Sequence, residues 1–297
     1  MTDRRITEPN YGRPADNLSE RPADLTGDTL AEVAARLTTE SPAQTAADLT
    51  NFKMAGSIAR NAVENSPVGL FHRRLTRLGV SAKLLFDNTI PQADEVVQPS
   101  RLKSAAPIID YQLSHRKHGL VDQVLTLPDE ERQAEAMALL KDKLQAFNAE
   151  DKTRLIDRAL HLFSTAGHSD DQIGGAQLLI HGYDYLSNSH KGQILDLLRG
   201  EGNAEDIYFN VQEDYRSRQR QPSSVHSNTS AQQAIDHDSE LVKIETAVRN
   251  LTADGLVPDE RLSDVERASN ALAERYRILR NEVIDSTRVR DNSGRGR

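Results

Sequence analysis

The fold of this protein is decided by the stretch Ser114–Gly200, which reads SHRKHGLVDQVLTLPDEERQAEAMALLKDKLQAFNAEDKTRLIDRALHLFSTAGHSDDQIGGAQLLIHGYDYLSNSHKGQILDLLRG. When this stretch is shifted by 39 residues it matches itself, and Phe147 falls on Leu186. A shift of 35 residues places Ser114–Leu127 on Ala149–Leu162. The same unit is therefore present as two copies and an earlier half-copy, and the rest of the chain is organised around it.

Each unit predicts a pair of helices. Between Asp129 and Phe147 apolar residues recur at spacings of three and four, and acids occupy the first turn, where the positive end of the helix dipole favours them. The segment from Asn148, a helix-capping residue type, to Phe163 carries a second stripe of the same kind. Helix pairs with a period near 40 residues are typical of solenoid repeats of HEAT or armadillo size.

Helix pairs of this kind must stack, because one pair cannot bury its own apolar face. We expect Leu155-Ile156 and their repeat equivalents Ile194-Leu195 to be buried between helix pairs. Gly174-Gly175 lies inside a helical pattern and lacks the strand and the lysine of a phosphate-binding loop. The glycine pair therefore favours close helix packing over contact with a ligand.

Two polar positions recur with the repeat. They are a lysine and, five residues later, an aspartate: Lys117, Lys152 and Lys191, with Asp122, Asp157 and Asp196. Five residues on a helix are separated by about 140°, so the two rows face different ways. Such rows either form a ladder between stacked repeats or present matching side chains to a partner. We favour the ladder and keep the partner surface as the alternative.

Composition and helical patterns predict how the chain is divided into segments. We expect a disordered N-terminal tail at 1–27, N-terminal helices at 28–87, a linker at 88–107, the helical-repeat domain at 108–215, a second linker at 216–230, a C-terminal helical hairpin at 231–286 and a disordered basic tail at 287–297. Within the N-terminal part, one helix is expected from Ser41-Pro42 to Asn65. No strand or hairpin pattern appears in the sequence. The predicted fold class is all-α, a short α-solenoid of helix-pair repeats flanked by amphipathic helices and the hairpin, with disordered tails.

The helix expected from Pro67 to Phe86 has an apolar stripe and a basic face. The stripe consists of Phe71, Leu75, Leu78, Ala82 and Leu85. Outside it lie Arg73, Arg74 and Arg77. A basic amphipathic helix can dock on a membrane surface or bind an acidic partner. We favour the interpretation as a core helix, because the preceding helix can cover the stripe.

Composition excludes several classes of function. The 297 residues contain no cysteine, which excludes disulfides, thiolate metal sites and cysteine nucleophiles. The net charge of −8 and the absence of tryptophan argue against nucleic-acid binding. No apolar run approaches the roughly 20 residues of a membrane span, and Met1 is followed by polar sequence, so we expect no cleavable signal peptide.

No catalytic constellation, metal site or cofactor site is predicted. His115 and His118 could share a helix face, but no glutamate follows in metalloprotease spacing and the neighbouring Arg116 and Lys117 oppose a dication. The serines lie in no nucleophile-elbow pattern, and no pair of acids stands out from the many on the expected helix faces. We therefore name no catalytic residue, no metal ligand and no cofactor.

Two segments resemble a known family. Leu127–Leu140, LPDEERQAEAMALL, and Lys152–Leu160, KTRLIDRAL, resemble the helical repeats of type III secreted effectors of plant-associated bacteria. The likeness covers the central third of the chain. A polar N-terminus without a cleavable signal suits that family, whose export signal lies there. The resemblance implies secretion, delivery into a host cell and action by binding host proteins; without it, we expect a cytoplasmic location.

The first functional hypothesis is thus a protein–protein interaction module, a secreted bacterial effector that binds host proteins through its repeats. The candidate partner-binding residues are Lys152, Arg154, Arg158 and Lys191 on the second helices, with Arg73, Arg74 and Arg77 on the basic helix. One alternative is an all-α enzyme whose site is assembled from scattered residues. Another is a peripheral membrane protein that binds through the basic helix at 67–86, which would require an exposed apolar stripe.

Overall fold

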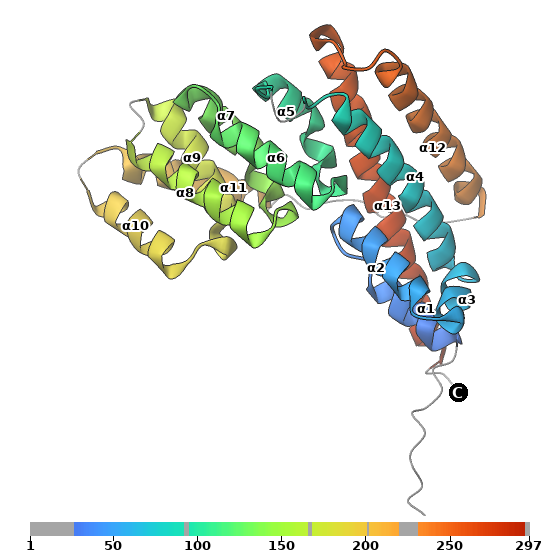
Figure 1. The fold of residues 1–297 in the computed structure, drawn as a ribbon. Coiled ribbons are helices and arrows are strands. Elements are labelled where there is room, and N and C mark those ends of the chain that lie inside the picture. Colours follow the sequence, from blue (N-terminus) through green and yellow to red (C-terminus); the bar gives the residue numbers. More distant parts are fainter. Residues whose placement is uncertain (1–26, 92–94, 166–167, 201, 220–230, 295–297) are drawn as a thin grey trace, which may run out of the picture.

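The computed structural model describes residues 27–91, 95–165, 168–200, 202–219 and 231–294. Every regular element in these ranges is an α-helix or a short 3-10 helix, and no strand occurs among them, so the predicted all-α class is confirmed. The helices form two neighbouring groups, a bundle and a stack, which Figure 1 shows side by side. Apolar side chains of both groups belong to one continuous core.

The bundle combines both ends of the described chain. It contains α1 (Gly27–Arg36), α2 (Pro42–Met54), α3 (Ser57–Glu64), α4 (Pro67–Asp87), α12 (Ala231–Thr252), the 3-10 helix η4 (Asp259–Arg261) and α13 (Leu262–Gly294). Helices α12 and α13 form the expected hairpin, and both pack along α4, as Figure 1 shows. The amide of Val257, in the connection after α12, donates a hydrogen bond of 2.8 Å to the carbonyl of Asn88, just after α4. The C-terminal hairpin is therefore part of the N-terminal bundle.

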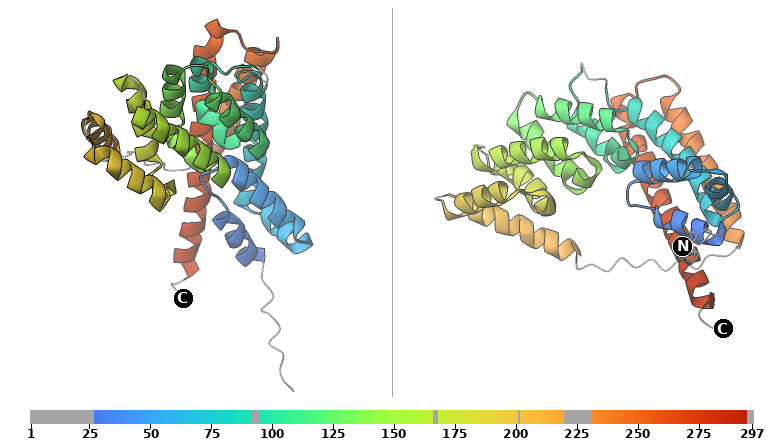
Figure 2. Two further views of the ribbon diagram at one scale, coloured as in Figure 1. Left: turned by 60° about the vertical axis from the view of Figure 1, so that its left-hand side comes forward. Right: turned by 60° about the horizontal axis from the view of Figure 1, so that its bottom comes forward.

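The stack contains the repeats. Its elements are α5 (Pro99–Ala105), η1 (Ala106–Tyr111), α6 (Ser114–Leu125), α7 (Glu130–Leu140), η2 (Lys141–Ala146), α8 (Ala149–Thr165), α9 (Ser169–His181), η3 (Tyr183–Tyr185), α10 (Asn188–Arg199) and α11 (Ala204–Gln219). Each unit is an α-helix, a 3-10 turn and a second α-helix, and the half-copy is completed by α5 and η1. First helices pack on first helices and second helices on second helices (Figure 2). This order is the one that a solenoid requires, while the solenoid itself stays a prediction.

Local signals place the helix starts. The carboxylate of Asp129 accepts a hydrogen bond of 2.8 Å from the Arg132 amide, and the side chain of Asn148 accepts one of 2.8 Å from the Asp151 amide. These bonds satisfy amide groups that have no partner inside their helices. Helix α8 therefore begins where the predicted capping residue Asn148 indicates, whereas Asp129, expected in the first turn of its helix, is the cap of α7.

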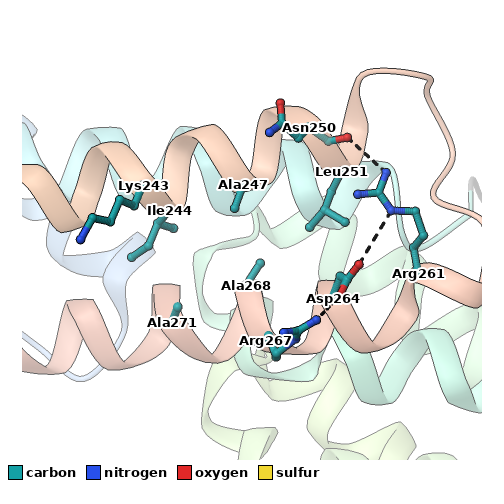
Figure 3. Close-up of a pocket in the computed structure, with 10 residues that line it drawn as sticks. All are labelled: Lys243, Ile244, Ala247, Asn250, Leu251, Arg261, Asp264, Arg267, Ala268 and Ala271. Carbon is teal, nitrogen blue, oxygen red and sulfur yellow. Dashed lines mark hydrogen bonds and ion pairs between the residues drawn. The ribbon is translucent and has the colours of Figure 1, made fainter.

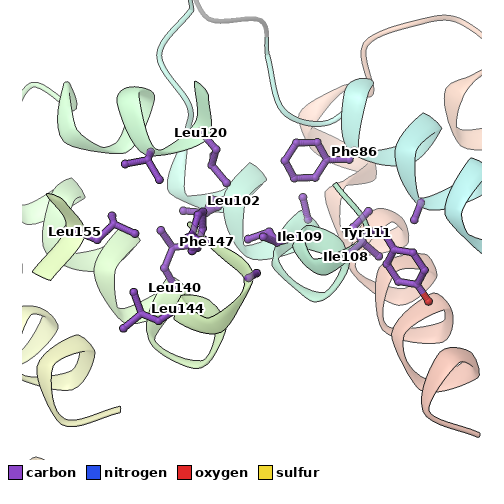
Figure 4. Packing of buried hydrophobic residues seen from close by; sticks show 14 of the residues in the cluster. Phe86, Leu102, Ile108, Ile109, Tyr111, Leu120, Leu140, Leu144, Phe147 and Leu155 are labelled. Carbon is purple, nitrogen blue, oxygen red and sulfur yellow. The ribbon is translucent and has the colours of Figure 1, made fainter. Parts of the chain in front are cut away.

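The core runs without interruption from the bundle into the stack. Figure 4 shows Phe86 of the bundle beside Ile108 and Ile109, and Leu155 of the stack farther along the same layer. Each of these four side chains is at most 1% exposed. Because α13 also packs on α5 and η1, the first unit is held between the bundle and the second unit.

The glycine pair brings α9 against its neighbours, as predicted. A Cβ atom on Gly174 would lie 2.4 Å from the carbonyl oxygen of Ala134 in α7. A Cβ atom on Gly175 would lie 2.5 Å from the carbonyl oxygen of Ala159 in α8. Both distances are far below van der Waals contact, so only glycine permits this spacing between the backbones.

Two predicted segment boundaries in the N-terminal half were wrong. The helix expected to reach Asn65 is broken into α2 and α3, because the chain leaves the helical conformation at Gly56. The expected linker at 88–107 contains α5, in which Leu102 and Ala105 are fully buried. Three prolines suggested a loop, yet Pro99 stands at the first position of α5, where its missing amide is not needed.

Two further boundaries differ in the C-terminal half. Helix α11 continues to Gln219 and so takes up the start of the linker expected at 216–230. Helix α13 continues to Gly294 and takes up most of the tail expected at 287–297. The disordered tail expected at 1–27 and the remainder of the second linker, 220–230, lie outside the described residues.

Candidate protein-interaction surface

The repeat lysines occupy one place in the stack. Lys117, Lys152 and Lys191, here called the lysine row, are each the fourth residue of a second helix, in α6, α8 and α10. This first turn is the positive end of the helix dipole, where a cation is unfavourable. In the part of the chain that the structure describes, none of the three makes an ion pair. The lysine row is therefore not the ladder that we favoured.

Two lysines of the row lie over tyrosine rings. The Lys152 ammonium is 4.2 Å from the ring centroid of Tyr185, and that of Lys191 is 4.5 Å from the centroid of Tyr183. Both rings belong to η3 and are half exposed, Tyr183 at 50% and Tyr185 at 41%. A cation within about 6 Å of a ring centroid is attracted by the ring quadrupole. The rings hold the ammonium groups at the surface without neutralising them.

The electrostatics of the row favour an added negative charge. Burial lowers the pKa of Lys117, and the nearby Lys152 lowers it further, against the opposing effect of Asp110. Burial also lowers the pKa of Lys152. Both are thus partly buried cations that have no ion pair among the described residues, and a carboxylate from another molecule would supply the opposite charge.

The aspartates form the ladder instead. Asp122 of α6 accepts a bond of 2.6 Å from Arg154 of α8, and Asp157 of α8 lies 2.9 Å from the His190 ring of α10. Each contact joins one second helix to the next. The predicted ladder is therefore confirmed for Asp122 and Asp157, while Asp196, at the same repeat position in α10, is exposed.

Four of the predicted partner-binding residues are used inside the molecule. Besides Arg154, the Arg158 Nε donates to the Gln133 side chain at 2.5 Å. On the basic helix, Arg74 Nε lies 2.9 Å from an oxygen of Asp238 in α12. Arg77 donates two bonds of 2.8 Å to the Glu245 carboxylate, also in α12: Nε to Oε1 and Nη2 to Oε2. Of the seven candidates, Lys152, Lys191 and the exposed Arg73 remain unpaired in the ranges described above.

The apolar stripe of α4 is covered. Its five members, Phe71, Leu75, Leu78, Ala82 and Leu85, are at most 3% exposed. They pack beneath α2, α3, α12 and α13. The interpretation as a core helix is thereby confirmed, and the exposed stripe that a membrane-surface helix requires is not present on α4. No described helix combines the length and the apolar character of a membrane span.

Histidine–carboxylate pairs also join successive units. His118 Nδ1 of α6 lies 2.7 Å from Asp151 of α8, and His181 of α9 lies 2.6 Å from Asp142 of η2. The bond to Asp151 is the main cause of a raised pKa for His118; the negative charges of Asp151 and Asp122 add to it, against burial and the charge of Arg154. The contact between α6 and α8 is therefore strongest while His118 is protonated.

We expect the stack to lose stability as the pH rises through the folded pKa of His118. A raised pKa contributes stability that is fully present below the unfolded value of about 6.5 and disappears above the folded one. The melting temperature of the wild type should therefore fall more between about pH 6 and pH 8 than that of His118→Gln. Equal pH dependence of the two proteins would contradict this role of His118.

The hairpin carries a groove of about 460 Å³ between α12 and α13, shown in Figure 3. Aliphatic side chains such as Ile244, Ala247 and Ala268 line it. Three of the charged groups at its rim pair with one another: Asp264 contacts both Arg261 and Arg267 (Figure 3). This lining gives the enzyme alternative no support. Among the described residues no group of three histidine or acidic side chains is placed to hold a metal ion.

Sequence reasoning missed the two tyrosines of this surface. The sequence pattern assigns a binding role to neither Tyr183 nor Tyr185. The sequence does contain a signal: two tyrosines lie in a short polar turn. A tyrosine ring combines a large apolar surface with a polar hydroxyl group, which suits a contact at the protein surface. Comparison of the chain with protein-family models, with curated proteins and with solved structures found no match.

Proposed function

We propose that this protein is a protein–protein interaction module and that the lysine row, with Tyr183 and Tyr185, binds an acidic segment of another protein. The observation that carries the proposal is the unpaired state of lysines at matched repeat positions, two of which lie over exposed rings. The units are held together by the apolar core and by the pairs Asp122–Arg154 and Asp157–His190, and none of these contacts uses the lysines.

The chemistry of the surface suits a polypeptide partner. Tyrosine supplies a large apolar area at low conformational cost and is enriched at the energetic centres of interfaces. The net charge of the chain is −8, so attraction of an acidic partner depends on this local cluster of cations. Because the lysines repeat from helix to helix, an extended acidic segment can contact more than one of them.

The setting of this function rests on the resemblance of the repeats to type III secreted effectors of plant-associated bacteria. We propose that the chain is such an effector, delivered into a host cell, and that the acidic partner is a host protein. The prediction of a cytoplasmic location is the alternative if no host protein is captured.

Lys152→Glu combined with Lys191→Glu should abolish capture of the partner from a plant-cell lysate. Each substitution replaces a cation over a ring by an anion, which repels an acidic segment. We expect helical circular dichroism and the melting temperature to be unchanged, because neither lysine is part of an ion pair within the described residues. Captured proteins would be identified by mass spectrometry.

A second variant with the same change of net charge controls for the loss of two cations. Arg73→Glu with Lys83→Glu makes the same change of charge on exposed positions of α4, outside the repeats. We expect this variant to capture the partner as the wild type does. Loss of capture in the α4 variant alone would place the interface on the basic helix. Loss of fold in the repeat variant would show that the lysines are structural.

A further inference from the structure

The lysine row presents its cations at a regular interval. Its members stand at the same position of α6, α8 and α10, the fourth residue of each helix. Helix α8 packs on both α6 and α10, and Figure 1 shows it between them. The axes of packed helices lie about 8–10 Å apart. Equivalent side chains on successive second helices are therefore expected to recur along the stack at that interval.

A β-strand and a polyproline II helix differ in how they meet such an interval. A β-strand rises about 3.3 Å per residue and alternates its side chains, so residues on one face lie about 6.6 Å or about 13 Å apart. A polyproline II helix has three residues per turn and rises about 3.1 Å per residue, so every third side chain lies on one face, about 9.3 Å from the previous one. The spacing of the second helices thus matches one turn of polyproline II.

The exposed tyrosines favour the same conformation. Tyr183 and Tyr185 belong to one short turn, η3, and are 50% and 41% exposed. Their rings contact Lys191 and Lys152, respectively, so an aromatic surface adjoins two successive cations of the row. Proline-rich segments in the polyproline II conformation dock on surfaces lined by aromatic side chains. Two rings beside two cations therefore suit a segment that combines prolines with acids.

Neighbouring acids of this chain leave Lys117 and Lys152 available. Burial lowers the pKa of Lys117, and the acid that opposes this shift, Asp110, is already paired with Lys143 at 2.8 Å. Burial also lowers the pKa of Lys152, with no contribution from a neighbouring acid. Glu150 precedes Lys152 by two residues and so lies about 200° away around α8. An acid of the partner therefore meets two cations that no described acid of this chain neutralises.

The α10 end of the row is also cationic. Arg199 is exposed and follows Lys191 by eight residues, so the two positions lie within about 80° of each other around α10. Asp196 follows Lys191 by five residues and lies about 140° away. The exposed Asp184 of η3 is a single acid against these two cations. Positive charge therefore exceeds negative charge at this end as well.

We propose that the partner segment of the lysine row adopts the polyproline II conformation and carries an acidic residue at every third position, with prolines between them. This inference rests on the proposed function, because it names the kind of acidic segment that the row binds. Each acid meets one lysine, and the prolines pack on Tyr183 and Tyr185. Proline also restricts the backbone before binding, which lowers the entropy cost of ordering an extended chain.

Two peptides of one composition test the spacing on the wild-type protein. The matched probe is Asp-Pro-Pro repeated three times. The control has the same residues in the order Asp-Pro-Asp-Pro-Asp-Pro-Pro-Pro-Pro, which turns its three acids to three different faces. Both carry an N-terminal fluorophore, and fluorescence anisotropy at low ionic strength measures binding. We expect the matched probe to bind about tenfold more tightly, because the control aligns only one acid with a lysine.

Lysine variants show where the matched probe binds. Lys152→Glu with Lys191→Glu should abolish its binding. Lys117→Gln should weaken its binding and remove its advantage over a probe shortened to two Asp-Pro-Pro units, which needs only two lysines. Lys83→Gln, at an exposed position of α4, should bind the matched probe as the wild type does.

The peptides also separate this inference from the proposed function. Equal binding of the matched probe and the control would overturn the polyproline II conformation alone, because an acidic segment of any spacing would then be bound. Tighter binding of a helical peptide with an acid at every seventh position, about 10.5 Å apart on one face, would also overturn it. Absence of saturable binding by any of these acidic peptides up to about 1 mM would contradict the proposed function as well.

Discussion

Gly174→Ala should lower the free energy of unfolding by about 3 kcal/mol, the upper part of the range for overpacked cores. The added methyl group would meet the carbonyl oxygen of Ala134 at 2.4 Å and its Cβ atom at 2.8 Å. Neither atom can move without shifting α7. The gain in helix propensity from glycine to alanine, about 0.5–1 kcal/mol, offsets only part of this cost. Chemical denaturation followed by circular dichroism measures the difference.

The repeat offers an internal control for this substitution. Gly192 lies within α10, and apart from the adjoining residues and backbone of that helix no atom lies within 4 Å of a Cβ placed there. Gly192→Ala should therefore stabilise the protein by about 0.5–1 kcal/mol, through propensity alone. Gly175→Ala, whose Cβ would lie 2.5 Å from the Ala159 carbonyl, should behave like Gly174→Ala. Equal effects at Gly174 and Gly192 would show that α9 does not approach its neighbours this closely.

The second large effect is expected at Leu155. This side chain is 0% exposed, and Leu155→Ala removes buried apolar volume and leaves a cavity, which costs about 2–5 kcal/mol. Leu195→Ala should change the free energy of unfolding by less than about 0.5 kcal/mol, because Leu195 is 51% exposed. Urea unfolding of both variants under the same conditions gives the comparison.

The variants at Leu155 and Leu195 also test a difference between the predicted repeat register and the structure. The repeat register predicts that Leu195 is buried like its equivalent Ile156, yet Ile156 is 1% exposed and Leu195 is 51% exposed. Ile194, at 4% exposure, does follow the prediction. A loss of stability at Leu195 as large as that at Leu155 would restore the original expectation that Leu195 is buried.

The sequence by itself determined the elements that depend on neighbouring residues. The self-match of Ser114–Gly200 predicted the helix pairs, and the capping residue Asn148 predicted where α8 begins. The glycine pair Gly174-Gly175 predicted close packing. These signals act within one or two turns of a helix, where the amide groups and the apolar stripe belong to the same segment.

Only the tertiary structure decided which of the recurrent polar residues are available to a partner. Lysines and aspartates recur with the same period, but the aspartates of α6 and α8 meet an arginine and a histidine of the next helix, while the lysine row meets tyrosine rings or solvent. In the sequence, Arg74 and Arg77 belong to a helix face without nearby acids. In the structure they pair with Asp238 and Glu245 of α12, which lie more than 160 residues later in the chain. The periodicity of a helix places a side chain around its own axis, whereas its partner depends on how distant segments pack.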